Sequence, residues 1–212
     1  MSKLYARILI TVACLINVGI AAVWAAPSVN GPTGLINIPS ADVLHEGQYS
    51  LGYYNLKEGG AGSFNFNLIR NLEMGIAGLR YDSSSNHTLL NAKYAVLPET
   101  ILTPGLAIGV EDLTGDQERS TYAAVSKALP FGFRIHAGVG NGRFSGGFYG
   151  IEKTINPISI LTGNSGFPAT TLILEHDGRH TNYGARLAVA AGLKLDAGWR
   201  DRNFYVGLNL TR

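Results

Sequence analysis

An alternation of apolar and polar residues runs through most of this chain, from Gln48 almost to Arg212. Clear examples are Phe64–Ile69, Phe131–Gly140 and Phe204–Leu210, in which every second side chain is apolar. Successive side chains of a β-strand point to opposite faces, so a period of two is typical of a strand that separates two environments. The pattern therefore predicts an all-β fold.

Turn signals divide the alternating region into about twelve segments of eight to eleven residues. A strand that crosses a membrane at a tilt needs roughly 9–11 residues, and single-chain bacterial barrels have an even number of strands. We therefore predict a single antiparallel up-and-down transmembrane β-barrel over residues 48–212. Its expected strands are Gln48–Lys57, Ser63–Asn71, Leu72–Tyr81, His87–Leu97, Thr103–Asp112, Arg119–Ala128, Phe131–Gly140, Gly146–Lys153, Ala169–His176, Thr181–Ala190, Gly192–Arg200 and Asn203–Thr211.

Residues 1–25 have the three parts of a secretory leader. Lys3 and Arg7 make a basic start, Ile8–Val23 is mostly apolar, and a small residue ends Val23–Ala25. This order predicts a cleavable signal peptide, since the apolar stretch is short for a stable membrane span. The alternatives are an uncleaved anchor and a buried N-terminal helix. An exported barrel is expected in the cell outer membrane.

Residues 26–47 differ from both the leader and the barrel. The segment has three prolines and several glycines and asparagines, and it has no alternation. Such a composition predicts an extended entry segment rather than a helix or strand. The sequence leaves open whether this segment enters the lumen or lies in the periplasm.

The charge balance argues against a nucleic-acid partner. The chain carries 17 Lys and Arg against 15 Asp and Glu, and two of the cations, Lys3 and Arg7, belong to the predicted leader. Their removal leaves 15 of each sign, so no basic surface is expected. The single cysteine, Cys14, is also in the leader, so we expect neither a disulfide nor thiol chemistry after it.

The alternation assigns side chains to two faces. Lipid is expected to contact Phe64, Phe66, Leu68, Met74, Ile76, Leu90, Tyr94, Leu106, Ile108, Val110, Phe133, Ile135, Val139, Leu172, Leu174, Tyr183, Leu187, Leu193, Leu195, Trp199, Phe204, Val206 and Leu208. The lumen is expected to contain Asn65, Asn67, Glu73, Asn91, Lys93, Glu111, Arg134, His136, Glu152, Glu175, Arg186, Lys194, Asp196, Arg200 and Asn209.

The inward set includes five carboxylates and five cations. A charge that faced lipid at mid-bilayer would cost about 2–4 kcal/mol, which is why we place these groups inside. Equal numbers of both signs predict mutual pairing in a filled lumen rather than a wide, ion-selective pore. The alternative is a soluble barrel or sandwich with its apolar face inside.

Six inward side chains are candidates for contact with a ligand or with packed lumen groups: Lys93, Glu111, Arg134, His136, Glu175 and Arg186. Catalysis would need a nucleophile beside His136, and Ser126 and Ser145 are available, although no spacing motif joins them. The run Glu175–Gly178 is not expected to bind a metal, because neighbouring strand residues point to opposite faces. We expect no catalytic residue, metal or cofactor.

Two stretches carry a family resemblance. The entry segment and first strand read GPTGLINIPSADVLHEGQYSLGY, and the later stretches read GRFSGGFYGIEK and LILEHDGRHTNYGARL. The first region resembles the start of YjbH-type proteins, in which a Gly-Leu-Ile, Pro and Gly-Gln series leads into the first strand. The later region resembles that family's paired aromatic-Gly strand and its Glu-x-Asp-Gly hairpin. Larger members of that family are several times this length, so this chain is expected to be a compact member.

The resemblance implies an outer-membrane barrel associated with exopolysaccharide production or export. We therefore predict a non-enzymatic outer-membrane β-barrel in envelope structure or in surface-polysaccharide assembly or export. Its expected partners are outer-membrane lipid, polysaccharide and envelope-export proteins. Two alternatives stay open: an outer-membrane lipid hydrolase or acyltransferase that uses His136, and a secreted soluble β-barrel that binds a small ligand.

Overall fold

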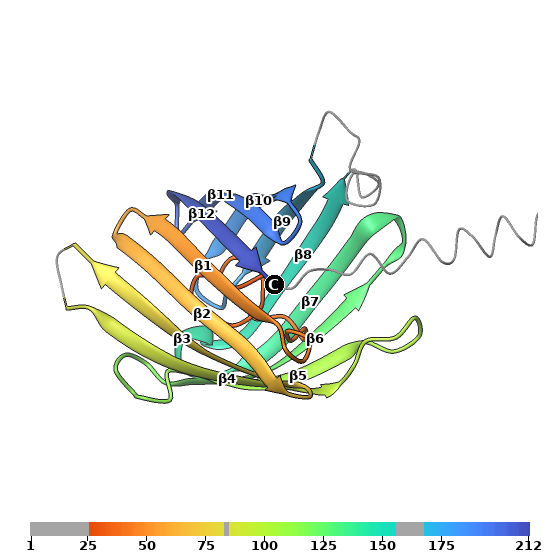
Figure 1. Cartoon of the computed structure of the whole chain (residues 1–212), viewed down its shortest axis with the longest axis horizontal. Helices are drawn as coiled ribbons and strands as arrows, with labels where there is room; N and C mark the ends of the chain where they lie inside the picture. Colours follow the sequence, from red (N-terminus) through yellow and green to blue (C-terminus); the bar gives the residue numbers. More distant parts are fainter. Residues whose placement is uncertain (1–25, 83–84, 156–167) are drawn as a thin grey trace, which may run out of the picture.

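The computed structural model describes residues 26–82, 85–155 and 168–212, and in these ranges the chain forms one closed β-barrel (Figure 1). Each strand pairs antiparallel with the next in sequence, and β12 pairs with β1 to close the sheet. The strands are β1 (Tyr49–Leu56), β2 (Gly59–Ile69), β3 (Leu72–Tyr81), β4 (His87–Leu97), β5 (Gly105–Glu111), β6 (Ser120–Ala128), β7 (Phe133–Gly140), β8 (Gly146–Ile155), β9 (Thr170–His176), β10 (Thr181–Ala190), β11 (Leu193–Arg200) and β12 (Asn203–Thr211).

The predicted twelve-strand, up-and-down barrel is thus confirmed, with small differences at strand ends. The largest difference is at β2, which begins at Gly59 rather than at Ser63. The glycine-rich stretch that predicts a turn instead continues the ladder, with Gly60 opposite Arg80 of β3. Gly59 has φ +144°, a conformation that L side chains rarely adopt, so glycine at this position allows the strand to start directly after the turn.

The outer face of the barrel is apolar, as the alternation predicts. Every member of the predicted lipid-facing set is exposed or half-exposed, for example Leu174 at 50% and Trp199 at 44%. A soluble barrel would bury these side chains, so the soluble alternative is wrong. The exposed apolar band and the closed sheet are what a strand-built protein needs in a bilayer, because no backbone edge is left unpaired.

The interior is occupied by the entry segment, which Figure 1 shows as a red-orange coil inside the barrel. Every residue from Ala26 to Ala41 is buried. The segment folds back on itself through main-chain hydrogen bonds, such as Val29 N to Ile36 O (2.9 Å). We call residues 26–44 the plug.

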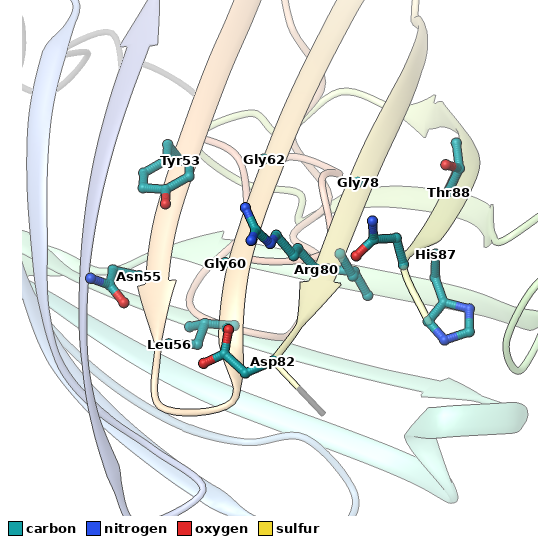
Figure 2. A pocket seen from close by; sticks show the side chains of 13 residues that line it. Tyr53, Asn55, Leu56, Gly60, Gly62, Gly78, Arg80, Asp82, His87 and Thr88 are labelled. Carbon is teal, nitrogen blue, oxygen red and sulfur yellow. The ribbon is translucent and has the colours of Figure 1, made fainter. Parts of the chain in front are cut away.

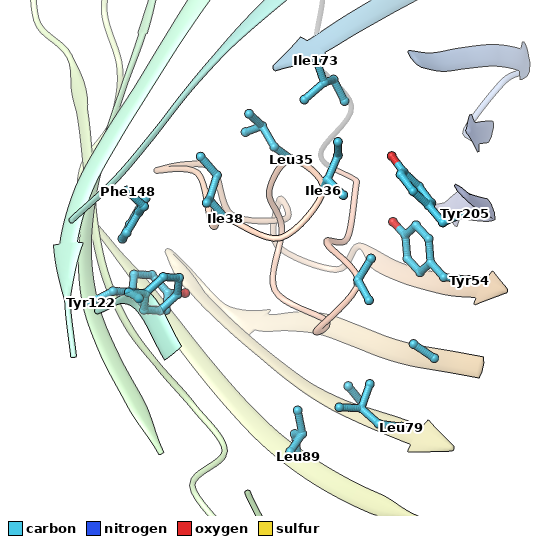
Figure 3. Packing of buried hydrophobic residues seen from close by; sticks show 14 of the residues in the cluster. Leu35, Ile36, Ile38, Tyr54, Leu79, Leu89, Tyr122, Phe148, Ile173 and Tyr205 are labelled. Atoms are coloured by element: carbon cyan, nitrogen blue, oxygen red, sulfur yellow. The ribbon is translucent and has the colours of Figure 1, made fainter. Parts of the chain in front are cut away.

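The plug supplies the centre of the apolar core. Leu35, Ile36 and Ile38 are almost fully buried and lie between side chains of opposite barrel walls (Figure 3). The surrounding wall residues include Tyr54, Leu79, Leu89, Tyr122, Phe148, Ile173 and Tyr205. The barrel therefore has an apolar outer face and, on the inside, apolar contacts with its own plug.

The predicted signal peptide, residues 1–25, lies outside the described residues, as do residues 156–167 between β8 and β9. In the parts of the chain that the structure describes, no helix has the length and apolarity needed to cross a membrane.

Candidate functional site

The polar lumen and the plug within it form the candidate site. All fifteen side chains predicted to point inward are buried or half-buried, which confirms the assignment of this face. Many of their hydrogen bonds go to the main chain of the plug. An extended coil has unpaired N–H and C=O groups, and these need partners when it is buried.

Glu175 of β9 anchors one turn of the plug through three main-chain amides. Its carboxylate accepts hydrogen bonds from the amides of Ile36 (2.9 Å), Asn37 (2.7 Å) and Ile38 (3.4 Å). The side-chain amide of Asn182 donates a further bond of 2.9 Å. Successive N–H groups that converge in a turn form a concave anion site, and a buried carboxylate fits it without a basic partner.

Glu73 of β3 binds the plug at two places. It accepts hydrogen bonds from Thr33 N (2.7 Å), Thr33 Oγ1 (2.5 Å) and Leu44 N (3.0 Å). Lys93 lies 3.6 Å from the same carboxylate and donates to Thr33 O at 2.7 Å. This pair is almost fully buried, and both charges are compensated by each other and by the plug.

Arg186 of β10 binds the opposite side of the plug. Its guanidinium donates to Gly34 O (3.2 Å) and Leu35 O (3.1 Å), and it forms an ion pair with Asp196 of β11 at 2.9 Å. Arg186 therefore bridges a barrel carboxylate and two plug carbonyls. On the same side of the lumen, the Tyr54 hydroxyl donates a further hydrogen bond to the plug, to Pro27 O at 2.5 Å.

Three asparagines complete the contacts along β2 and β4. Their side-chain amides donate to carbonyls of the plug: Asn65 to Gly31 (2.7 Å), Asn91 to Asn30 (2.8 Å) and Asn67 to Leu44 (2.5 Å). The sequence places these asparagines inside the barrel but does not single them out as candidates.

The end of the plug carries an ion pair of its own. Arg134 of β7 pairs bidentately with Asp42 and also contacts Glu99 at 2.8 Å. Burial alone would raise the pKa of Asp42, but the adjacent Arg134 guanidinium outweighs it and holds that pKa well below its usual value. Asp42 is therefore ionised and fixed to the barrel wall at neutral pH.

Two arginines contact the plug near the rim formed by the β7–β8 and β11–β12 connections. Arg143 lies in the β7–β8 connection, and Arg200 is the last residue of β11. Arg143 pairs with Glu111 of β5 and donates to Asn37 O at 2.7 Å. Arg200 donates to Asn37 Oδ1 at 2.7 Å, and the side-chain amide of Asn37 donates to the Asp177 carboxylate at 2.7 Å. The carboxylate of Asp177 accepts several hydrogen bonds, which outweigh its burial and lower its pKa.

Ser126, His136 and Glu152 lie in a row on the inner wall. Ser126 Oγ is 2.8 Å from His136 Nδ1, and His136 Nε2 is 3.4 Å from Glu152 Oε2. The order nucleophile, base and acid resembles that of acyl-transfer enzymes. However, Ser126 Oγ accepts a hydrogen bond of 2.8 Å from Ala41 N of the plug, and both Ser126 and His136 are buried. In this state the row holds the plug and is closed to substrate.

The six predicted site residues thus surround the plug, whose position in the lumen the sequence leaves open. Lys93, Arg134, Glu175 and Arg186 contact the plug directly. The other two, Glu111 and His136, reach it through Arg143 and Ser126.

The expected pairing of inward charges with one another is only partly right. Among the described residues, two ion pairs of this kind form, Glu73 with Lys93 and Arg186 with Asp196. Other inward charges form ion pairs with residues that are not predicted to point inward, as Arg134 does with Asp42. The reason is the plug, whose main chain and side chains compete for the same charges.

Asn37, Asp42 and Arg143 contribute contacts to the candidate site, and sequence reasoning missed them. They lie in irregular segments, and only their position in Pro- and Gly-rich stretches distinguishes them. Among the described residues, no group of three or more His, Cys, Asp or Glu side chains could hold a metal ion.

A closed antiparallel sheet with an apolar exterior and a polar, filled interior defines a transmembrane β-barrel. The family model described as "Exopolysaccharide biosynthesis protein YbjH" matches residues 28–159, which include most of the plug and β1 to β8. The chain belongs to this YjbH family.

Comparison with curated proteins gives no match. Among solved structures, the chain is similar to a doubly substituted mutant of a porin from Rh. blastica, with 12% identity and a TM-score of 0.35. The similarity covers 74% of this chain and 56% of the porin chain.

Proposed function

We propose that this chain is a non-enzymatic outer-membrane β-barrel that serves surface-polysaccharide assembly or export, with a lumen that its own plug keeps closed. The observation that carries the proposal is the plug itself, held by hydrogen bonds from inward Glu, Asn, Lys and Arg side chains to its main chain. Family membership supports the link to exopolysaccharide.

An outer-membrane location is supported by the physical character of the surface. The outer face carries large apolar side chains around the whole barrel, and a strand-built barrel is the form that can cross a bilayer without a helix. Barrels of this kind are typical of outer membranes.

The plug gives the barrel a closed and, in principle, an open state. In the closed state the polar groups of the wall bind plug amides and carbonyls. If the plug leaves, the same carboxylates, amides and guanidinium groups line a hydrated channel, and they are the donors and acceptors that sugar hydroxyls need. Polysaccharide passage would therefore be coupled to plug release, while the closed state would act as a seal in the envelope.

The proposal is tested in cells of the source organism that lack the gene. Complementation with the full chain is expected to restore released exopolysaccharide, and fractionation is expected to recover the chain with outer-membrane lipid. Cells that release the same amount of polymer with and without the gene would contradict the polysaccharide role. Recovery in the soluble fraction would contradict the location.

A second candidate function is suggested by the Ser126–His136–Glu152 row, which would suit a lipid hydrolase or acyltransferase once the plug is removed. It is the weaker candidate because these side chains face the lumen, whereas membrane lipid contacts the outer face of the barrel.

A further inference from the structure

Four neighbouring strands leave a hollow on the outer face of the barrel, close to the rim formed by the β1–β2 and β3–β4 connections (Figure 2). One cross-strand row of outward residues runs Tyr53, Gly62, Gly78 and Thr88. The two central glycines have no side chains, so the row is deep in the middle and raised at its ends. The resulting pocket has a volume of about 500 Å³.

The next row towards the rim brings a charge to this hollow. It runs Asn55, Gly60 and Arg80, and Figure 2 shows the Arg80 side chain extending from β3 towards β2. A Cβ atom at Gly60 would lie 3.3 Å from the Tyr53 hydroxyl, so the tyrosine lies beside the same glycine. Asp82 also lines the pocket, but no ion pair joins it to Arg80 in the part of the chain that the structure describes.

Arg80 is unusual among the charges of the outer face. In the described strands, the outward charged side chains are Arg80, Lys127 and Lys153, and none is a carboxylate. Lys127 donates to the carbonyl of Thr100, and Lys153 donates to that of Phe131, so both lysines are satisfied by loops. Within the described residues, the Arg80 guanidinium has neither a hydrogen bond nor an ion pair.

We propose that this hollow binds one phosphate-bearing anionic lipid of the surrounding leaflet. The guanidinium of Arg80 receives the phosphate, and an acyl chain lies along the glycines Gly62 and Gly78. Arginine binds phosphate through two parallel hydrogen bonds, and such bonds are strengthened near a low-dielectric region. Arg80 is the next-to-last residue of β3, a position that places its charge where headgroups meet the acyl region. The inference goes beyond the proposed function and does not depend on it.

The test uses native mass spectrometry of the folded barrel in detergent, with phosphatidylglycerol or phosphatidylcholine added. The wild-type chain is expected to retain one phosphatidylglycerol in preference to phosphatidylcholine. Arg80→Gln is expected to weaken that retention about tenfold, because it removes a charge-assisted contact. Gly78→Leu is expected to weaken retention while keeping the charge, since a Cβ at Gly78 has nothing within 4 Å and the added side chain fills the hollow.

Two matched variants serve as controls. Arg70→Gln removes an exposed arginine at the opposite rim, and Ala137→Leu adds an outward leucine elsewhere on the wall. Both are expected to retain lipid as the wild type does, and heat-modifiable migration on a gel verifies that each variant is folded. Equal retention by Arg80→Gln and wild type would overturn the proposal. So would equal retention of the two lipids, or displacement of phosphatidylglycerol by millimolar inorganic phosphate, which would assign the site to a free anion.

Discussion

Glu175 holds the plug by a contact in which both carboxylate oxygens act as acceptors. Its carboxylate accepts three main-chain N–H groups, so Glu175→Gln would place a donor against donors and leave at least one amide without a partner. We expect this variant to lose about 1–3 kcal/mol of stability. Denaturant unfolding of the barrel in detergent measures the loss. Glu46→Gln, at an exposed carboxylate outside the lumen, is the matched control, and an equal effect of both substitutions would contradict the anchoring role.

Substitution of Ser126 tests whether the row Ser126, His136 and Glu152 is structural or catalytic. Ser126→Ala removes the hydroxyl that links Ala41 N to His136, so we expect a loss of about 1–3 kcal/mol in stability with unchanged envelope lipids. Denaturant unfolding and lipid profiling of the envelope check the two parts. A change in lipid acylation in cells that carry the variant would favour the enzymatic candidate instead.

Asp42 makes the plug sensitive to acid. Because Arg134 keeps the pKa of Asp42 below its unfolded value, the pair contributes stability that is fully present above the unfolded pKa of about 3.9 and is lost as pH falls through the folded pKa. We expect wild type to be more stable than Asp42→Asn by a constant margin from about pH 5 to 8, and this margin should shrink below about pH 4. Unfolding midpoints across this range measure it, and a margin that grows on acidification would contradict the sign.

At the scale of elements, the start of β2 depends on one glycine. Gly59 has φ +144°, and a Cβ there would collide with the main chain of Arg80. Gly59→Ala is therefore expected to destabilise the β1–β2 and β2–β3 ladders by about 1–3 kcal/mol. Gly78→Ala, where a Cβ meets open space, is expected to be close to neutral. The temperature at which heat-modifiable migration is lost compares the two variants. Equal temperatures would contradict the argument.

The alternation in the sequence predicts the elements well because lipid and lumen impose opposite demands on neighbouring residues. Leu174 and Glu175 are adjacent in β9, yet one is 50% exposed and the other 2%. Strand ends are predicted less well. The glycines at the start of β2, for example, are compatible with a turn and with a paired strand, and the sequence does not decide between the two. The sequence does not predict the position of the plug, because residues 26–47 have no periodicity and their contacts are far away in the chain. Ile36 and Glu175, for example, are 139 residues apart.

At the scale of the whole molecule, the barrel has an apolar outer face, an apolar centre and one polar layer between them. Exposed apolar side chains cover the outer face, and Leu35, Ile36 and Ile38 fill the centre. The charged layer between them binds the plug main chain. The sequence predicts the filled lumen but assigns it to paired wall charges. The structure assigns it to the plug, a segment of the same chain that the wall charges bind.

Planar-bilayer recording of the purified barrel tests the central claim, which is that the plug closes the lumen. The wild-type chain is expected to show no steady conductance, and a variant that lacks residues 27–44 is expected to show stable channel openings once its fold is verified by heat-modifiable migration. A large, steady conductance from the wild-type chain would contradict the account, as would a folded deletion variant that stays closed.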